Sequence, residues 1–137
     1  MKPTVLDLKR KKGARLAMLT AYDFPSARLV AEAGVDLILV GDSLGMVVLG
    51  YDSTLPVTVA DMVHHTRAAR RGAPEAFLIA DMPFLSYATP ERAVDTAARL
   101  MQEAGADSVK LEGGEEVTPI VEALVRSGVP VLGWRGV

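Results

Sequence analysis

The chain has 137 residues, of which half are hydrophobic, and its formal net charge is −2. This composition is typical of a single globular domain, and the scattered basic residues argue against nucleic-acid binding. The sequence has no apolar run of about 18 residues, no secretory signal at its start and no Cys, which excludes disulfides and thiolate metal sites. We therefore expect a cytoplasmic protein with neither a nucleic-acid nor a membrane partner.

Short apolar runs alternate with segments that carry helix signals. Three helices are expected to open with an Asp or Thr at the N-cap, at Asp23, Thr58 and Thr89, followed by Pro or an acid in the first turn, and Gly or Pro follows the helix ends. The expected elements, in chain order, are a solvated lead-in helix over 4–12, a strand over 15–20, a helix over 23–33, a strand over 37–40, a helix over 58–71, a strand over 76–80, a helix over 89–105, a strand over 108–111, a helix over 116–127 and a strand over 129–132.

The order of strands and helices predicts parallel strands joined by helical crossovers. Two architectures fit, a (β/α)8 barrel and an open doubly wound sheet. No G-x-G-x-x-G motif follows the first strand, and buried strands that end in acids favour the barrel. Because a barrel takes about 250 residues, we expect residues 1–137 to form the N-terminal part of one (β/α)8 barrel domain, truncated after about strand five.

Two helix-to-strand junctions have nearly the same sequence. Residues 32–36 read EAGVD and residues 103–107 read EAGAD, and each is followed by a strand. We interpret this faint repeat as one type of turn that the chain uses twice.

Acidic residues stand where three neighbouring strands end. Asp42 and Ser43 follow one buried strand, Asp81 follows the next, and Lys110 and Glu112 share a face of the third because they are two residues apart. The Gly-rich segment 44–55 has no helical period and is long for a connecting loop, which is typical of functional loops. The carboxyl ends of parallel strands carry the chemistry of α/β folds, so these side chains are candidate site residues.

The oxygen-rich composition of this group suits Mg²⁺, which takes one or two carboxylates together with water and substrate oxygens. A Lys beside the metal could hold a substrate carboxylate or offset a developing enolate. The alternative is structural, because an Asp after a strand is often a helix cap or turn residue. The vicinal pair His64–His65 cannot place both rings on one helix face, so we interpret it as surface or packing histidines.

Several blocks of the sequence resemble ketopantoate hydroxymethyltransferase. The longest is LVGDSLGMVVLGYDSTLPVT, over 39–58, and the similarity runs from about Arg15 to Gly133. The other blocks are TAYD over 20–23, HTRAARRGAP over 65–74, ADMPFLSYATPERA over 80–93 and VKLEGGE over 109–115.

The resemblance implies a barrel of the phosphoenolpyruvate/pyruvate superfamily type. It also implies transfer of a hydroxymethyl group from the co-substrate 5,10-methylenetetrahydrofolate to 3-methyl-2-oxobutanoate, which gives 2-dehydropantoate in pantothenate and coenzyme A biosynthesis. The reaction would pass through an enolate that Mg²⁺ stabilises. The full-length family is expected to form a homo-oligomer of the decamer type.

Matching the motifs residue by residue gives the expected site. Asp42 and Asp81 match the Mg²⁺ ligands of the family, and Glu112 matches a third acid close to the metal. Asp42, Ser43, Asp81 and Lys110 match substrate contacts.

The end of the chain departs from the family pattern. Trp134 stands where the family usually has His in a segment like GHLGL, and the chain reads GWRGV over 133–137. The Glu that serves as the general base in the family lies on a later strand, so we expect no catalytic base within residues 1–137. A truncated gene product or a change of reading frame near codon 134 would produce this pattern.

Two other functions remain open. One is a related Mg²⁺-dependent lyase or mutase that acts on 2-oxo acids, against which the blocks over 39–58 argue. The other is a catalytically inactive half-barrel, which would leave strand edges unpaired and apolar residues in water, and would be poorly stable or would associate.

Overall fold

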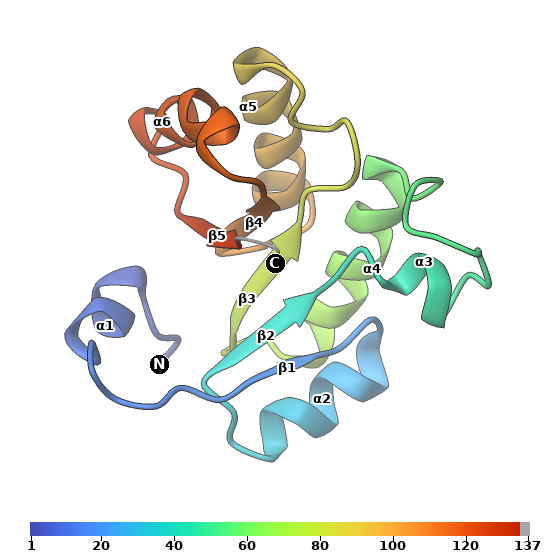
Figure 1. Cartoon of the computed structure of the whole chain (residues 1–137). Helices are drawn as coiled ribbons and strands as arrows, with labels where there is room; N and C mark the ends of the chain where they lie inside the picture. Colours follow the sequence, from blue (N-terminus) through green and yellow to red (C-terminus); the bar gives the residue numbers. More distant parts are fainter. Residues whose placement is uncertain (135–137) are drawn as a thin grey trace.

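Five parallel strands form one sheet in the computed structural model, which describes residues 1–134 (Figure 1). The strands lie in the sheet in the same order as in the chain. A doubly wound sheet would reverse this order part-way, so the consecutive order is that of a barrel wall. The strands are β1 (Met18–Thr20), β2 (Leu37–Val40), β3 (Phe77–Asp81), β4 (Ser108–Glu112) and β5 (Val131–Trp134).

Helices connect the strands, and most of their starts agree with the predicted caps. The side chains of Asp23, Thr58 and Thr89 each accept a hydrogen bond from a backbone N–H in the first turn of the helix that follows. The helices are α1 (Val5–Arg10), α2 (Phe24–Glu32), α3 (Leu44–Val47), α4 (Val59–Gly72), α5 (Pro90–Ala98), which continues as a π-helical turn (Arg99–Glu103), and α6 (Thr118–Arg126), which follows a 3₁₀ turn (Glu115–Val117).

The two faces of the sheet have different neighbours. Ile38, Leu78 and Val109 point outward into the main core, where helices α2, α4, α5 and α6 cover the strands. The alternate residues, such as Leu39 and Ile79, form a second apolar cluster on the inner face. Because helices cover one face in succession, the fold is that of a barrel wall with its inner face turned to the barrel axis.

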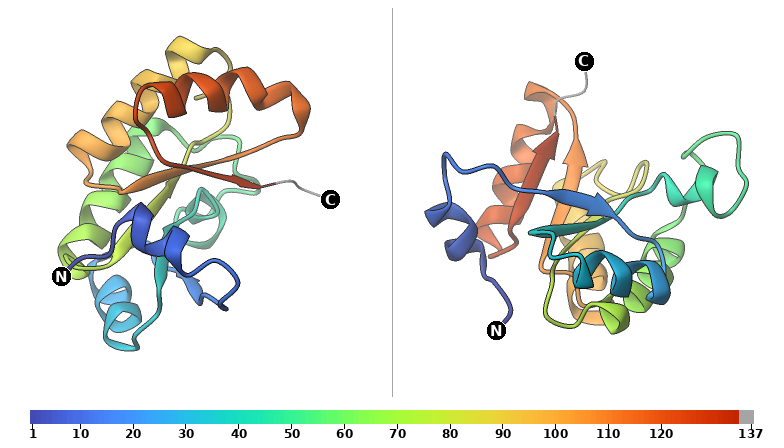
Figure 2. Two further views of the ribbon diagram at one scale, coloured as in Figure 1. Left: turned by 90° about the vertical axis from the view of Figure 1, so that its left-hand side faces the viewer. Right: turned by 90° about the horizontal axis from the view of Figure 1, so that it is seen from below.

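Helix α1 lies on the inner side of the sheet, opposite α2 (Figures 1 and 2). Val5 and Leu8 of α1 are half-buried against the inner cluster of Leu39, Phe77 and Ile79. The interpretation of this segment as a solvated lead-in helix is therefore wrong for its apolar side, which covers the inner layer of the sheet. Pattern alone could not show this, because the partners lie more than thirty residues away in the chain.

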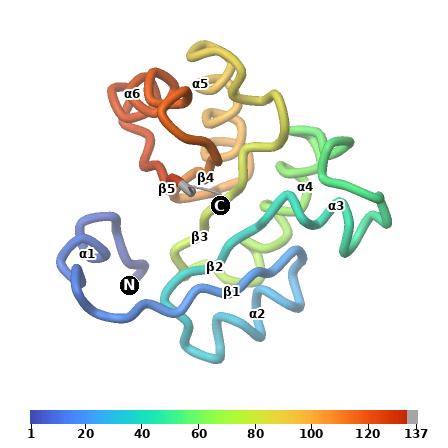
Figure 3. Tube along the Cα trace, viewed as in Figure 1, coloured from blue at the N-terminus to red at the C-terminus, as the bar shows by residue number. Residues whose placement is uncertain are grey.

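Two strands begin later than predicted, and the segment over 44–55 contains a helix, each for a local reason. The first strand begins at Met18, because the backbone N–H of Ala17 donates to the Asp36 carboxylate at 2.9 Å instead of to a strand. The last strand begins after Pro130, which has no N–H to give to the ladder. The segment over 44–55 contains the one-turn helix α3, too short to show a period, and projects beyond the end of β2 (Figure 3).

The repeated junction is confirmed as one turn used twice. Gly34 and Gly105 both have positive φ angles, 78° and 80°, as expected at a helix C-terminus. Asp36 then accepts a hydrogen bond from the backbone N–H of Ala17, and Asp107 accepts one from the backbone N–H of Leu78. In both cases the Asp ties its junction to the strand that precedes it in the sheet.

No helix within residues 1–134 is both long enough and apolar enough to cross a bilayer. The sequence predicts a departure from the family pattern over 133–137. Residues 135–137 of that segment lie outside the described part of the chain.

Candidate active site

The structure brings the predicted strand-end residues together. Asp42 directly follows β2, Asp81 is the last residue of β3, and Lys110 and Glu112 lie on β4. They line one cavity of about 140 Å³ at the carboxyl end of the sheet. Further residues that line it are Thr54, Leu55, Met82, Phe84, Tyr87 and Leu111.

Asp81 and Lys110 form the buried centre of this group. Their positions are opposite one another in the β3–β4 pairing, and the Lys110 ammonium donates to Asp81 Oδ1 at 2.9 Å and to Glu112 Oε1 at 3.2 Å. The other oxygen of Asp81, Oδ2, accepts a hydrogen bond from the backbone N–H of Asp42 at 2.9 Å. Burial alone would lower the pKa of Lys110, but its bonds to the two carboxylates raise that pKa above the ordinary value. Lys110 is therefore a fixed positive charge.

Asp42 lies in a different environment from Asp81. Burial first, and then the negative charges of Asp81 and Glu112, raise the pKa of Asp42 to about 6, although Lys110 acts in the opposite direction. Within residues 1–134, Asp42 forms no ion pair with a Lys or Arg. The Asp42 carboxylate therefore lies near the Asp81 carboxylate and has no positively charged partner of its own in this part of the chain.

Gly41 allows this close approach. A Cβ atom on Gly41 would lie 2.9 Å from Ser43 Oγ and 3.4 Å from Asp81 Oδ2. Ser43 stands at the N-cap of α3, yet its side chain makes no capping hydrogen bond. Its hydroxyl lies instead 2.9 Å from the hydroxyl of Tyr22. The predicted substrate contact Ser43 is thus at the edge of the carboxylate group.

Several residues near the site were not predicted as site residues. Tyr87 donates a hydrogen bond to the Glu112 carbonyl at 3.2 Å, and burial raises its pKa. Tyr22, Leu55 and Phe84 lie in loops that follow the strands, where periodicity gives no signal. The only sequence feature that could have pointed to these three residues is their position in the blocks that resemble the family.

The donor atoms fit a magnesium ion with few protein ligands. Asp42 and Asp81 offer carboxylate oxygens from neighbouring strands, whereas Glu112 is paired with Lys110. In the described part of the chain, no group of three or more His, Asp or Glu side chains is arranged to hold a metal. Two carboxylates with water and substrate oxygens are nevertheless the usual magnesium environment. The metal-binding and substrate-binding roles given to these residues from the sequence therefore stay predictions.

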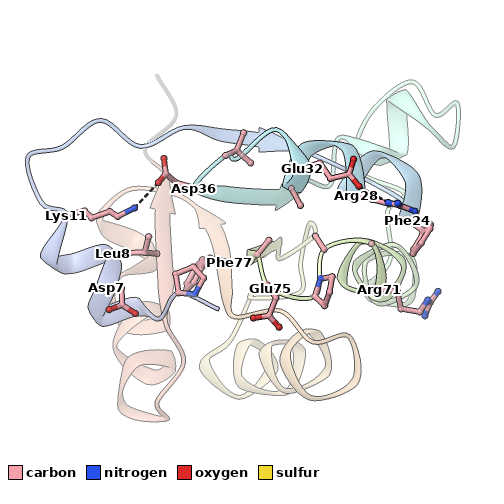
Figure 4. Close-up of a pocket in the computed structure, with 17 residues that line it drawn as sticks. Asp7, Leu8, Lys11, Phe24, Arg28, Glu32, Asp36, Arg71, Glu75 and Phe77 are labelled. Carbon is pink, nitrogen blue, oxygen red and sulfur yellow. Dashed lines mark hydrogen bonds and ion pairs between the residues drawn. The ribbon is translucent and has the colours of Figure 1, made fainter. Parts of the chain in front are cut away.

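A larger cavity of about 710 Å³ lies at the opposite, amino end of the strands (Figure 4). Two ion pairs lie in its lining, Lys11 with Asp36 at 3.0 Å and Arg28 with Glu32 at 2.9 Å, and Asp7, Arg71 and Glu75 also line it. Because this cavity lies away from the strand ends where parallel sheets carry chemistry, we place the candidate site at the carboxyl end.

A sequence model of the ketopantoate hydroxymethyltransferase family matches residues 2–137. The chain belongs to this family. Among its curated relatives, the 3-methyl-2-oxobutanoate hydroxymethyltransferase of Thermus thermophilus is 67% identical over 136 residues, which are 99% of this chain and 52% of the relative. The enzyme of the same name from Geobacillus kaustophilus is 60% identical over 128 residues, covering 93% of this chain and 46% of the relative. The chain thus spans about half the length of these relatives.

Solved structures bear out the fold of this hydroxymethyltransferase family member. A 2,3-dimethylmalate lyase, described as a member of the PEP mutase/isocitrate lyase superfamily, matches with a TM-score of 0.69 at 20% identity, over 98% of this chain and 52% of that one. An oxaloacetate acetylhydrolase matches with a TM-score of 0.67 at 18% identity, over 88% and 47%. At this identity the likeness concerns the fold alone, and it confirms the predicted fold class.

Proposed function

We propose that the chain carries the metal-binding and 2-oxo-acid-binding half of a 3-methyl-2-oxobutanoate hydroxymethyltransferase. The whole protein would transfer a hydroxymethyl group from 5,10-methylenetetrahydrofolate to 3-methyl-2-oxobutanoate and form 2-dehydropantoate. The support is membership of the family together with the names of its relatives. The folate site, the general base and the homo-oligomer of this proposal belong to the whole protein.

The residues of this chain would bind and orient the 2-oxo acid. Asp42 and Asp81 would hold Mg²⁺, with Glu112 near it. When bound, Mg²⁺ supplies a Lewis acid that stabilises negative charge on the keto oxygen of the substrate. Lys110 would hold the Asp81 carboxylate in place, because it donates to that carboxylate from a buried position. Ser43 would contribute a hydroxyl to the substrate.

The observation that carries the proposal is the Asp42–Asp81 pair at adjacent strand ends with the Lys110 ammonium beside it. Its test is calorimetric titration of 3-methyl-2-oxobutanoate into the 137-residue chain, with Mg²⁺ or with a chelator. We expect binding that requires Mg²⁺. Asp42→Asn and Asp81→Asn should each weaken it at least about tenfold, since each removes a charged ligand.

The matched control is Asp52→Asn, which changes an exposed carboxylate in the projecting loop outside the cavity. This variant should bind the acid as the unchanged chain does. Binding that persists with the chelator and is unaffected by both site variants would contradict the proposed function.

Proton exchange at C3 of 3-methyl-2-oxobutanoate addresses the inactive half-barrel as the competing interpretation. Exchange in Mg²⁺ without folate, at a rate above that of the metal alone, would exclude an inactive chain. A requirement for folate in the complete reaction would in turn separate the hydroxymethyltransferase from a lyase or mutase of the same fold.

A further inference from the structure

Ser43 occupies a helix N-cap position without acting as a cap. An N-cap Ser with an extended backbone accepts a hydrogen bond from the first turn of its helix, but Ser43 has helical φ and ψ angles of −55° and −14° and makes no such bond to α3. The hydroxyl is instead 2.9 Å from the Tyr22 hydroxyl. Tyr22 is half-buried in the connection between β1 and α2, twenty-one residues earlier in the chain. A neighbouring strand end, and not its own helix, therefore holds this hydroxyl.

The direction of this hydrogen bond determines what Ser43 can do. A Ser hydroxyl has one proton to donate and can accept two bonds. If the Tyr22 hydroxyl donates to Ser43 Oγ, the proton of Ser43 is free to point elsewhere. A Cβ atom built on Gly41 would lie near both Ser43 Oγ, at 2.9 Å, and Asp81 Oδ2, at 3.4 Å. The Ser43 hydroxyl therefore lies on the same side of Gly41 as the Asp81 carboxylate.

The backbone of Tyr22 is hydrogen-bonded to a side chain of α4. The Nδ1 atom of His65 lies 2.7 Å from the Tyr22 carbonyl oxygen. Because a carbonyl oxygen only accepts, Nδ1 must carry the proton and donate it. His65 thereby anchors the backbone of Tyr22, and Asp23 next to it is fixed as the N-cap of α2. His64, the neighbour of His65, is exposed and has no such role.

We propose that Tyr22 is a positioning residue that holds the Ser43 hydroxyl as a donor toward the bound 2-oxo acid, with His65 fixing Tyr22 through its backbone carbonyl. The part that concerns the acid rests on the proposed function. The part that concerns the orientation of Ser43 does not, and it can be measured without any ligand.

The first test is the side-chain conformation of Ser43, from three-bond NMR couplings to its β-protons in the 137-residue chain. We expect one χ1 rotamer in the unchanged chain and averaging over several in Tyr22→Phe, which removes one oxygen and keeps the ring. The matched control is Tyr51→Phe, in the projecting loop, which should leave Ser43 in one rotamer. A fixed Ser43 in Tyr22→Phe would overturn the proposal whether or not the chain binds a 2-oxo acid.

The second test separates positioning from general loss of structure. In Mg²⁺, Tyr22→Phe should weaken the binding of 3-methyl-2-oxobutanoate about threefold to tenfold, the worth of one hydrogen bond. In the Ser43→Ala background the same change should have no further effect, because Tyr22 acts through Ser43. Additive losses would overturn the proposal. Absence of binding by a chain whose Ser43 is fixed by Tyr22 would contradict the proposed function and leave the positioning supported.

The third test concerns His65. His65→Leu removes the donor to the Tyr22 carbonyl and should partly release the Ser43 rotamer. His65→Asn retains a donor near the position of Nδ1 and should restore the single rotamer. If Ser43 stays fixed in His65→Leu, the role given to His65 is wrong.

Discussion

Asp42 and Asp81 stand at adjacent strand ends, yet their surroundings give them different properties. Asp81 accepts hydrogen bonds from the Lys110 ammonium and from a backbone N–H, so its negative charge is well compensated. Asp42 has no ion pair within residues 1–134, and its pKa is raised to about 6. Asp81 is thus fixed in place by its hydrogen bonds, whereas Asp42 has no positively charged partner of its own among the described residues.

The pH dependence of stability should reveal Asp42. Its pKa in the folded chain lies above the unfolded value, so this carboxyl stabilises the fold fully below about pH 3.8, and its contribution is lost as the pH rises through about 6. With a chelator present, Asp42→Asn should therefore be more stable than the unchanged chain at pH 7.5, by about 1–2 kcal/mol after allowance for partial exposure. Urea unfolding at pH 4 and pH 7.5 measures the difference.

Asp52→Asn is the control for this measurement, because Asp52 is exposed in the projecting loop. It should show no gain that depends on pH. A constant difference between Asp42→Asn and the unchanged chain at both pH values would contradict the raised pKa.

At the scale of elements, the helix-to-strand junctions are where the structure is tied together. Arg70 near the end of α4 donates to the carbonyls of Ala73, Pro74, Ala76 and Gly105, and to the Asp107 carboxylate at 2.6 Å. Arg70 lies in the last turn of α4, and its half-buried guanidinium joins two junctions. Its neighbour Arg71 is exposed.

Replacing Arg70 by Lys should be costly. An ammonium cannot reproduce the planar fork of donors, and several partly buried carbonyls would lose their partner. We expect Arg70→Lys to lower the free energy of unfolding by about 2–4 kcal/mol. The matched change Arg71→Lys should alter it by less than about 0.5 kcal/mol. Equal effects of the two changes in urea unfolding would show that the bonds of Arg70 contribute little.

The repeated junction allows a comparison within one chain. Gly34→Ala should cost about 1 kcal/mol, because the residue has a positive φ and no atom within 4 Å of a new Cβ. Gly105→Ala should cost more, since its Cβ would lie 3.1 Å from Cγ of Arg70. Thermal unfolding of both variants measures the order. A larger loss for Gly34→Ala would mean that the contact with Arg70 is relieved without cost.

At the scale of the molecule, the described sheet has two open edges. Strands β1 and β5 each pair with one neighbour within residues 1–134. Leu16, Met18 and Leu19, at or next to the β1 edge, are exposed large apolar residues. Unpaired strand edges with apolar side chains favour association with other chains.

We therefore expect the 137-residue chain to associate, with a melting temperature that rises with protein concentration. Leu19→Lys places a charge at the β1 edge and should shift sedimentation toward the monomer. Leu29→Lys, at an exposed position on α2, is the control and should shift it less. A sharp, reversible melt of a monomer, independent of concentration, would contradict this prediction.

The sequence by itself determined the succession of elements and the residues at the strand ends. Strand runs, the N-caps Asp23, Thr58 and Thr89, and the Gly-ended helices are local signals, because each depends on residues within one or two turns. A single parallel sheet then requires that successive strand ends meet. For that reason the grouping of Asp42, Asp81 and Lys110 could be predicted before the fold was known.

The tertiary structure alone decided which side chains meet across long stretches of chain. It placed α1 on the inner face of the sheet, Arg70 between two junctions, and the Tyr22 hydroxyl on Ser43. It also gave Asp42 and Asp81 different burial and different hydrogen-bond partners, and therefore different properties. These outcomes depend on packing between residues twenty to eighty positions apart, and periodicity and capping signals carry no information over that distance.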